Sequence, residues 1–293
     1  MVTTELVVQQ VINGISIGSW LFLVAVGLSL IFGVLDVLNF AHGALFMIGA
    51  YVTIVAIGSV GSFWGGLVLA ALAVGAVGAI VEMVFIRRLY GREEEVLDQL
   101  LMTFAFVLII TDGIRAVFGS GSVVTAPPAS LRGSIGLVGG FGIGTYRAFL
   151  VVASIVVMGA ILAALRSTNF GRLVRSTSSD RGMALLLGID VPRLYTAVFF
   201  IGAAMAGVAG GLITPLQSVT PGLGNQIIIN AFVVVVIGGL GSFTGAFIGA
   251  YVIGIMIAVG SIYAAGAGQL FPFVALIVVL LVRPQGLLGS VDA

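Results

Sequence analysis

Nine apolar stretches separated by short polar connections follow one another along the chain. The apolar residues run continuously rather than with a period of two, which is typical of helices in lipid and argues against a membrane β-barrel. The pattern predicts an all-α, polytopic membrane helix bundle that forms one domain over residues 1–293. We place the stretches at about 9–34, 43–61, 64–86, 98–118, 148–166, 194–214, 226–241, 244–263 and 269–283. The second, seventh and ninth are short for a crossing and could be re-entrant, so both eight and nine crossings stay open.

The composition places this bundle in a lipid bilayer. Hydrophobic residues make up 60% of the chain and charged residues 8%, against about 25% charged residues in an ordinary soluble domain. The mean hydropathy is +1.28. The 43 glycines lie mostly inside the apolar stretches, where small residues let helix backbones approach each other. Glycines four residues apart predict such contacts at Gly14 and Gly18, at Gly207 and Gly211, and at Gly241, Gly245 and Gly249.

The same composition excludes several classes of function. The chain has no cysteine, so disulfides, thiol catalysis and thiolate metal sites are excluded. All 12 basic residues are arginines, so the chain lacks the lysine of a standard ATP-binding loop. Basic residues do not interleave with aromatic ones, which argues against nucleic acid as a partner. We see no nucleophile–base pair in the spans, and we expect neither an enzyme nor a metal or cofactor site. The first ten residues lack the basic start of a cleavable signal peptide.

The arginines indicate how the chain is oriented. Nine of them fall in the connections after the third and fifth stretches and after the last, and three fall near the other side. Arginine collects on the cytoplasmic side of membrane proteins. We therefore expect a multi-pass protein of the cell membrane with a cytoplasmic C-terminus, and the side of the N-terminus depends on the number of crossings. The outer connection, about 119–146, is rich in Gly, Ser and Pro and should contain no long helix.

Two pairs of opposite charges lie near the ends of predicted spans. Glu82 lies within about a turn of Arg87, and Asp112 is three residues before Arg115 on one helix face. Because a charge in the membrane is costly, we expect Glu82 to pair with Arg87 or to snorkel to the interface, and Asp112 and Arg115 are placed to pair.

The segment 39–52, "NFAHGALFMIGAYV", contains His42, the only histidine of the chain. In one interpretation it is a junction: the Asn39 side-chain oxygen caps the second helix by accepting from the N–H of Ala41 or His42. In the other it is a broken-helix site that faces a translocation path. The sequence around this single histidine offers no Ser or Cys nucleophile, which argues against catalysis. The candidate residues for the path are Asn13, Asn39, His42, Gly43 and Asn230.

The inner connection "GRLVRSTSSDRGMALLLGIDVPR" (171–193) contains a predicted short helix. Asp180 is a candidate N-cap and Gly188 a candidate residue for the left-handed turn at the end. Between them Met183, Leu186 and Leu187 form an apolar face at helical spacing. This face lies on the membrane or docks on a cytoplasmic partner, and the spacing alone does not choose between the two.

Three segments resemble permeases of branched-chain amino-acid ABC importers. They are "GLSLIFGVLDVLNFAHGALFMIGAYV" (27–52), "SSDRGMALLLGIDVPR" (178–193) and "VVVVIGGLGSFTGAFIGA" (233–250). The Asn-Phe-Ala-His-Gly form of the first segment and the absence of an N-terminal extension are similar to the LivH type.

The resemblance implies a subunit driven by others. The partners would be two cytoplasmic ABC ATPase subunits, a second homologous permease of the LivM type and an extracytoplasmic solute-binding protein. The 180–190 helix would be the coupling helix in a cleft of the ATPase. The cargo would be branched-chain or similar small, polar amino acids, with urea or short amides as an alternative and a stand-alone channel or secondary carrier as a more distant one. The expected ATPase-coupling residues are Asp180, Arg181, Met183, Ala184, Leu187, Gly188 and Asp190.

Overall fold

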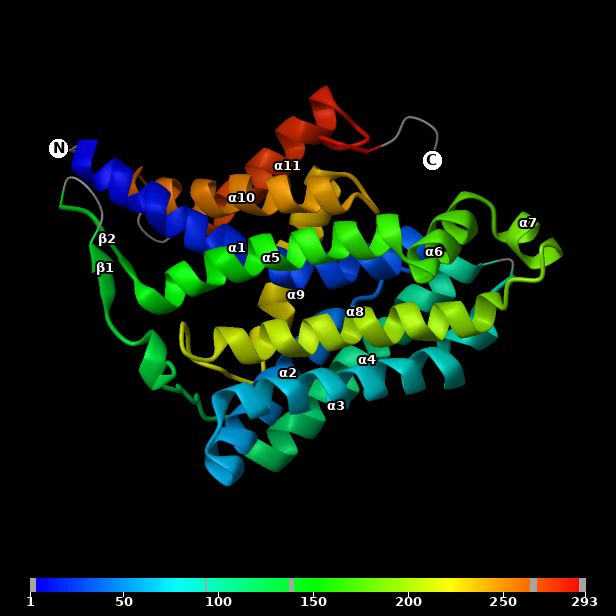
Figure 1. Cartoon of the computed structure of the whole chain (residues 1–293), viewed down its shortest axis with the longest axis horizontal. Helices are drawn as coiled ribbons and strands as arrows, with labels where there is room; N and C mark the ends of the chain where they lie inside the picture. Colours follow the sequence, from blue (N-terminus) through cyan, green and yellow to red (C-terminus); the bar gives the residue numbers. More distant parts are fainter. Residues whose placement is uncertain (1–3, 93, 137–139, 264–267, 290–293) are drawn as a thin grey trace. The chain divides into compact units, whose positions relative to one another are not determined.

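The computed structural model describes residues 4–92, 94–136, 140–263 and 268–289 (Figure 1). Its long helices are α1 (Thr4–Leu35), α2 (Ala41–Val60), α3 (Phe63–Val84), α4 (Glu95–Phe118), α5 (Thr145–Ser167), α8 (Val191–Ile213) and α10 (Phe243–Tyr263). The shorter helices are α6 (Asn169–Ser179), α7 (Arg181–Leu186), α9 (Leu223–Gly238) and α11 (Phe271–Val282), with 3-10 turns η1 (Ile86–Leu89), η2 (Ala129–Leu131) and η3 (Gly268–Leu270).

Seven helices in the described residues are long and apolar enough to cross a membrane. This confirms the predicted polytopic helix bundle, and the chain is a multi-pass membrane protein. The seventh and ninth predicted spans are α9 and α11, with 16 and 12 residues. At a rise of 1.5 Å per residue, these helices are shorter than a hydrocarbon core of about 30 Å. The second span is longer than the sequence indicated: α2 has 20 residues, enough for a full crossing.

The helices group into two compact units. Unit 1 comprises residues 1–26, 127–159 and 230–293, and unit 2 comprises residues 27–126 and 160–229. Helices α1, α5 and α9 each contribute residues to both units. The prediction of one membrane domain over the whole chain stays a prediction.

In unit 2, helices α2, α3 and α8 pack side by side, with α4 against α2 (Figure 1). Glycines on α8 make this possible. A Cβ added at Gly207 would lie 2.7 Å from the Ala70 carbonyl oxygen on α3, and one at Gly210 would overlap the carbonyl of Phe46 on α2. Such distances leave no room for any side chain. The predicted close contact at Gly207 and Gly211 is therefore confirmed.

In unit 1, the N-terminal part of α1 packs on α10 in the same way. A Cβ at Gly14 would lie 2.5 Å from the Ile255 Cα, and one at Gly18 2.7 Å from the Tyr251 Cα. Of the predicted series Gly241, Gly245 and Gly249, only the last two lie in a helix, α10. Gly241 has φ +77° and lies in the turn before α10, because the chain must reverse there between α9 and α10.

The connection between α4 and α5, which we predicted to lie outside, contains no long helix in its described residues, as predicted. It carries η2 and a small antiparallel hairpin of β1 (Ser134–Gly136) and β2 (Gly142–Gly144), in which Ile135 pairs with Ile143. The hairpin was not predicted, because glycine-rich strands of three residues lack an alternating apolar pattern.

Candidate functional site

Helix α7 is short, but both of its ends are fixed. The Asp180 carboxylate accepts a hydrogen bond from the Met183 N–H at 2.9 Å. At the other end Gly188 has φ +80°. The N–H of Gly188 donates to Leu185 at 3.0 Å and that of Ile189 donates to Ala184 at 3.1 Å. These two bonds form a Schellman motif. The predicted caps at Asp180 and Gly188 are confirmed, and a six-residue helix is held in one shape.

The outward side of α7 is apolar. Met183, Leu186 and Leu187 are 52%, 84% and 72% exposed; we call these three residues the lever face. Ala184, by contrast, is 2% exposed and faces the rest of the chain. Large apolar side chains grouped on an exposed helix indicate a contact surface rather than a solvated loop.

Helix α6, which precedes α7, was missed by the sequence reading. Thr168 caps it by accepting from the Gly171 N–H at 3.0 Å. Gly171, Val174 and Thr177 form its buried face. A threonine followed by small or apolar residues every three positions was the signal that could have identified it. Helices α6 and α7 together form an ordered unit, which we call the helix pair, and α7 is its second helix.

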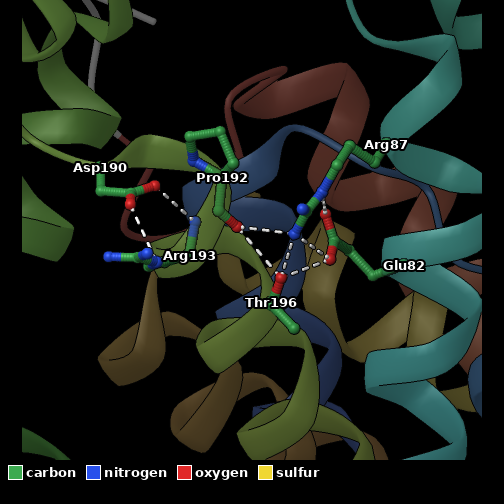
Figure 2. A network of polar contacts seen from close by, with 6 residues as sticks. All are labelled: Glu82, Arg87, Asp190, Pro192, Arg193 and Thr196. Atoms are coloured by element: carbon green, nitrogen blue, oxygen red, sulfur yellow. Dashed lines mark hydrogen bonds and ion pairs between the residues drawn. The ribbon is translucent and has the colours of Figure 1, made fainter.

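At the start of α8, an ion pair between Glu82 on α3 and Arg87 on η1 is linked to α8 by hydrogen bonds (Figure 2). Glu82 is fully buried, and the Arg87 guanidinium donates to both of its carboxylate oxygens, at 3.3 and 3.1 Å. Arg87 also donates to the Pro192 carbonyl at 3.0 Å and to the Thr196 hydroxyl. The Thr196 hydroxyl lies 2.7 Å from Glu82, to which it can donate. The predicted Glu82–Arg87 pair is thus confirmed and extended to α8.

The same end of α8 is capped by Asp190, one of the expected coupling residues. Its carboxylate accepts from the Arg193 N–H at 3.1 Å and pairs with the Arg193 side chain at 3.0 Å (Figure 2). Pro192 occupies the first turn, where its missing N–H costs nothing. The connection from α7 to α8 is short, and these contacts fix where α8 begins.

Arg181, the first residue of α7, lies against two aromatic rings. Its guanidinium carbon is 5.1 Å from the centre of the Tyr90 ring and 5.4 Å from that of Tyr195. The two rings contact each other edge to face, with their centres 5.3 Å apart. Burial raises the pKa of Tyr90, and the nearby Glu82 charge raises it further, so the hydroxyl stays neutral. Each cation–π contact contributes roughly 0.5–1 kcal/mol at an exposed site.

The break between α1 and α2 lies elsewhere in unit 2. Helix α1 ends at Leu35, and Asp36 has φ +57°, a left-handed conformation that aspartate tolerates. Helix α2 is preceded by Phe40 and has no side-chain cap. The prediction that Asn39 caps α2 through its side chain is therefore wrong. Only the Asn39 backbone carbonyl takes part, accepting from the His42 N–H at 3.2 Å.

The break is packed tightly. The Thr103 hydroxyl on α4 lies 3.4 Å from both the Leu38 carbonyl and the Phe40 N–H, and so connects the break to α4. His42 is fully buried, and a Cβ added at Gly27 on α1 would lie 3.0 Å from its ring. A Cβ at Gly43 would overlap the Gly224 carbonyl on α9. Thr103 was not among the expected path residues.

The five candidate path residues divide between the two units. Asn39, His42 and Gly43 lie together at the break in unit 2. Asn13 and Asn230 belong to unit 1. There the Asn13 oxygen accepts from Arg147 at 3.0 Å and its NH₂ donates to Gln10 at 3.1 Å. Asn230 is half-buried on α9.

A family model matches residues 10–282, and its description is "Branched-chain amino acid transport system / permease component". The chain belongs to this permease family. The match includes α2, the helix pair α6–α7 and all seven long helices in whole or in part. No solved structure matches this permease.

Curated relatives cover nearly the whole permease. The LivH permease protein of the high-affinity branched-chain amino acid transport system of Escherichia coli K12 is 35% identical over 296 residues, 96% of this chain and 95% of the relative. BraD of Pseudomonas aeruginosa, named for the same kind of system, is 31% identical over 298 residues, with the same two coverages. The ribose import permease protein RbsC of Escherichia coli K12 is more distant, at 28% identity over 64% of this chain and 59% of its own length.

The acidic side chains and the histidine of this permease are its candidate metal ligands. In the ranges that the structure describes, no group of three or more His, Cys, Asp or Glu side chains is placed to hold a metal ion. The described ion pairs Glu82–Arg87 and Asp112–Arg115 lie near helix ends. Among them is the predicted Asp112–Arg115 pair, which forms at 2.8 Å.

Asn39 offers a test of the break. Its side chain is fully buried, and neither its oxygen nor its nitrogen has a hydrogen-bond partner among the described residues. An unsatisfied buried polar group costs about 1–3 kcal/mol. We therefore expect Asn39→Leu, which is similar in volume, to keep or raise the melting temperature in detergent, and to reduce uptake if the amide serves the passing solute. A clear drop in melting temperature would contradict this, because it would mean that the amide is paired.

Proposed function

We propose that this permease is the membrane-spanning subunit of an ABC importer for branched-chain or similar small, polar amino acids, and that separate ATPase subunits drive it through α7. The observation that carries the proposal is the lever face. Three large apolar side chains stand exposed on a helix whose two ends are capped. A free loop gains nothing from this arrangement, whereas a docking helix needs both an apolar face and a fixed shape.

The charge distribution supports docking in the cytoplasm. Helix α7 lies in the arginine-rich connection 166–193, and such connections are cytoplasmic by the positive-inside rule. The same rule gives a cytoplasmic C-terminus, since Arg283 follows α11. ATPase subunits are cytoplasmic, and the chain has no lysine with which to build a standard ATP-binding loop itself. Two ATPase subunits, a second permease of the LivM type and an extracytoplasmic binding protein complete the proposed importer.

The cargo follows from the relatives and from the chemistry of the break. LivH and BraD are named for branched-chain amino acid transport. The candidate path residues at the break, Asn39, His42 and Gly43, supply a neutral amide, an imidazole and backbone, which suit a path of low affinity for small polar solutes. Selectivity then lies chiefly in the binding protein, which is consistent with a related permease named for ribose import.

The test is uptake in a strain that lacks its own branched-chain amino acid importers. We expect the chain, expressed with its neighbouring ATPase, permease and binding-protein genes, to restore leucine uptake. Excess valine or isoleucine should compete with leucine, and urea, acetamide and ribose should not. Competition by urea or acetamide alone would replace the amino-acid cargo with a short amide. Uptake that persists without the ATPase genes would contradict the proposed class.

A further inference from the structure

We infer that Arg181 is a positioning residue that clamps the start of α7 onto α8 and onto the α3–α4 connection. The inference rests on the proposed function, because it explains how movement of α7 would reach the membrane helices. Arg181 is the first residue of α7, directly after the Asp180 cap. Its two aromatic partners come from different parts of unit 2: Tyr195 from the first turns of α8, and Tyr90 from the connection after η1.

The geometry is that of a cation held against a two-ring platform. The guanidinium carbon lies 5.1 and 5.4 Å from the two ring centres, within the range of cation–π attraction. The centres of the two rings are 5.3 Å apart in an edge-to-face contact, so each ring restricts the orientation of the other. Arginine suits this place because its flat guanidinium stacks on aromatic faces and always stays charged.

The surroundings of the platform favour a cation. The carboxylates of Glu95, at the start of α4, and of Asp36, at the break after α1, act electrostatically on the Tyr195 hydroxyl, and so does Arg181. Neither carboxylate is within ion-pair distance of Arg181. The described contacts that hold the guanidinium are therefore the two rings and not an ion pair.

The platform is connected through the backbone to the Glu82–Arg87 network. Thr196, which follows Tyr195 on α8, can donate to Glu82 at 2.7 Å. Tyr90 follows η1, the turn that contains Arg87. The Tyr195 ring is thus next in sequence to Thr196, and the Tyr90 ring is next to η1, which contains Arg87. Both Thr196 and Arg87 belong to the network between α3 and α8 (Figure 2). When α7 moves, Arg181 pulls on both rings. Because the segments that carry the rings are joined by the Glu82–Arg87–Thr196 network, α3 and α8 move together.

The first experiment needs no partner subunit. The chain contains no cysteine, so spin labels can be placed at Leu186→Cys on α7 and Val96→Cys on α4, both exposed. In the full chain in lipid nanodiscs we expect a narrow distribution of distances between the two labels. Arg181→Ala should broaden it, and Arg181→Lys, which keeps the cation, should largely restore it. An unchanged distribution in Arg181→Ala would overturn the inference, whether or not an ATPase binds.

The Tyr90 hydroxyl provides a matched control. It is buried and has no hydrogen-bond partner among the described residues. Tyr90→Phe, which keeps the ring, should leave the distribution narrow, whereas Tyr90→Leu should broaden it. Because Arg181 and Tyr90 act on each other, Arg181→Ala combined with Tyr90→Leu should do no more than either change alone. Broadening by Tyr90→Phe would mean that the hydroxyl, not the ring, holds α7.

The second experiment uses the assembled importer. With Arg181→Ala we expect the ATPase subunits to co-purify as with the unchanged chain, while solute moved per ATP hydrolysed falls about fivefold. Arg175→Ala, which removes the same charge from the exposed side of α6, should have no effect. Loss of co-purification in Arg181→Ala would make Arg181 a docking contact and overturn the inference, while leaving the proposed function intact. Failure of the unchanged chain to co-purify with an ATPase would instead count against the proposed function.

Discussion

Leu186→Asp together with Leu187→Asp is expected to abolish uptake and to release the ATPase subunits, while the chain still inserts into the membrane. The two side chains are 84% and 72% exposed, so the fold does not depend on them. Burying a leucine contributes roughly 1.5–3 kcal/mol. Losing two such contacts weakens docking by about 3 kcal/mol or more, which is about a hundredfold in affinity. Co-purification of the ATPase with the tagged permease, and leucine uptake in cells, measure the two effects.

Val124→Asp is the matched control for these changes. Val124 is 65% exposed and lies in the outer connection, so the same change from an apolar to a charged side chain should leave uptake and ATPase binding unchanged. Normal ATPase binding in the Leu186–Leu187 variant would assign the lever face to the membrane surface instead. That is the alternative which the sequence left open.

Glu82→Ala is expected to give the largest loss of stability among single changes at the inner end. Glu82 is fully buried, whereas its partner Arg87 is one-third exposed. Removing one partner of a buried ion pair costs about 3–5 kcal/mol, and the partial exposure of Arg87 favours the lower value. The melting temperature in detergent should fall by several degrees. Uptake should fall with it, since the polar network between α3 and α8 is lost while their packing through Gly207 stays.

Two further variants show whether the loss of stability comes from burial of the ion pair or from the charges alone. Asp112→Ala removes a pair in which both side chains are more than half exposed, and such pairs contribute about 0–1 kcal/mol. Its melting temperature should hardly change. Glu82→Leu combined with Arg87→Met removes both charges and fills the space, so it should be much more stable than Glu82→Ala. If Glu82→Ala and Asp112→Ala melt alike, the network does not hold α3 to α8.

The sequence predicted well those features that depend on local chemistry. The apolar stretches identified seven long helices, because about 20 continuous apolar residues have few alternatives in a membrane. The caps at Asp180 and Gly188 could also be predicted, since a carboxylate before a helix and a glycine after it satisfy backbone groups a few residues away. Each of these depends on neighbours within one or two turns of the chain.

The features that failed or were missed depend on tertiary contacts. Asn39 has the right residue type for a cap, but Asp36 turns the chain earlier, and Phe40 takes the capping position. The platform under Arg181 joins two residues far apart in the sequence, Tyr90 and Tyr195, and neither forms part of a motif. Helix α6 was missed because it is largely polar and its buried face contains only small or medium-sized side chains.

The central claim is that the permease has no driving force of its own and is moved through α7 by ATP hydrolysis in other subunits. Leucine uptake into proteoliposomes tests it most directly, with the purified chain alone compared with the chain plus its ATPase subunits, second permease and binding protein. We predict that leucine accumulates against its gradient only in the complete assembly and only with ATP. Accumulation by the chain alone, without nucleotide, would contradict the account.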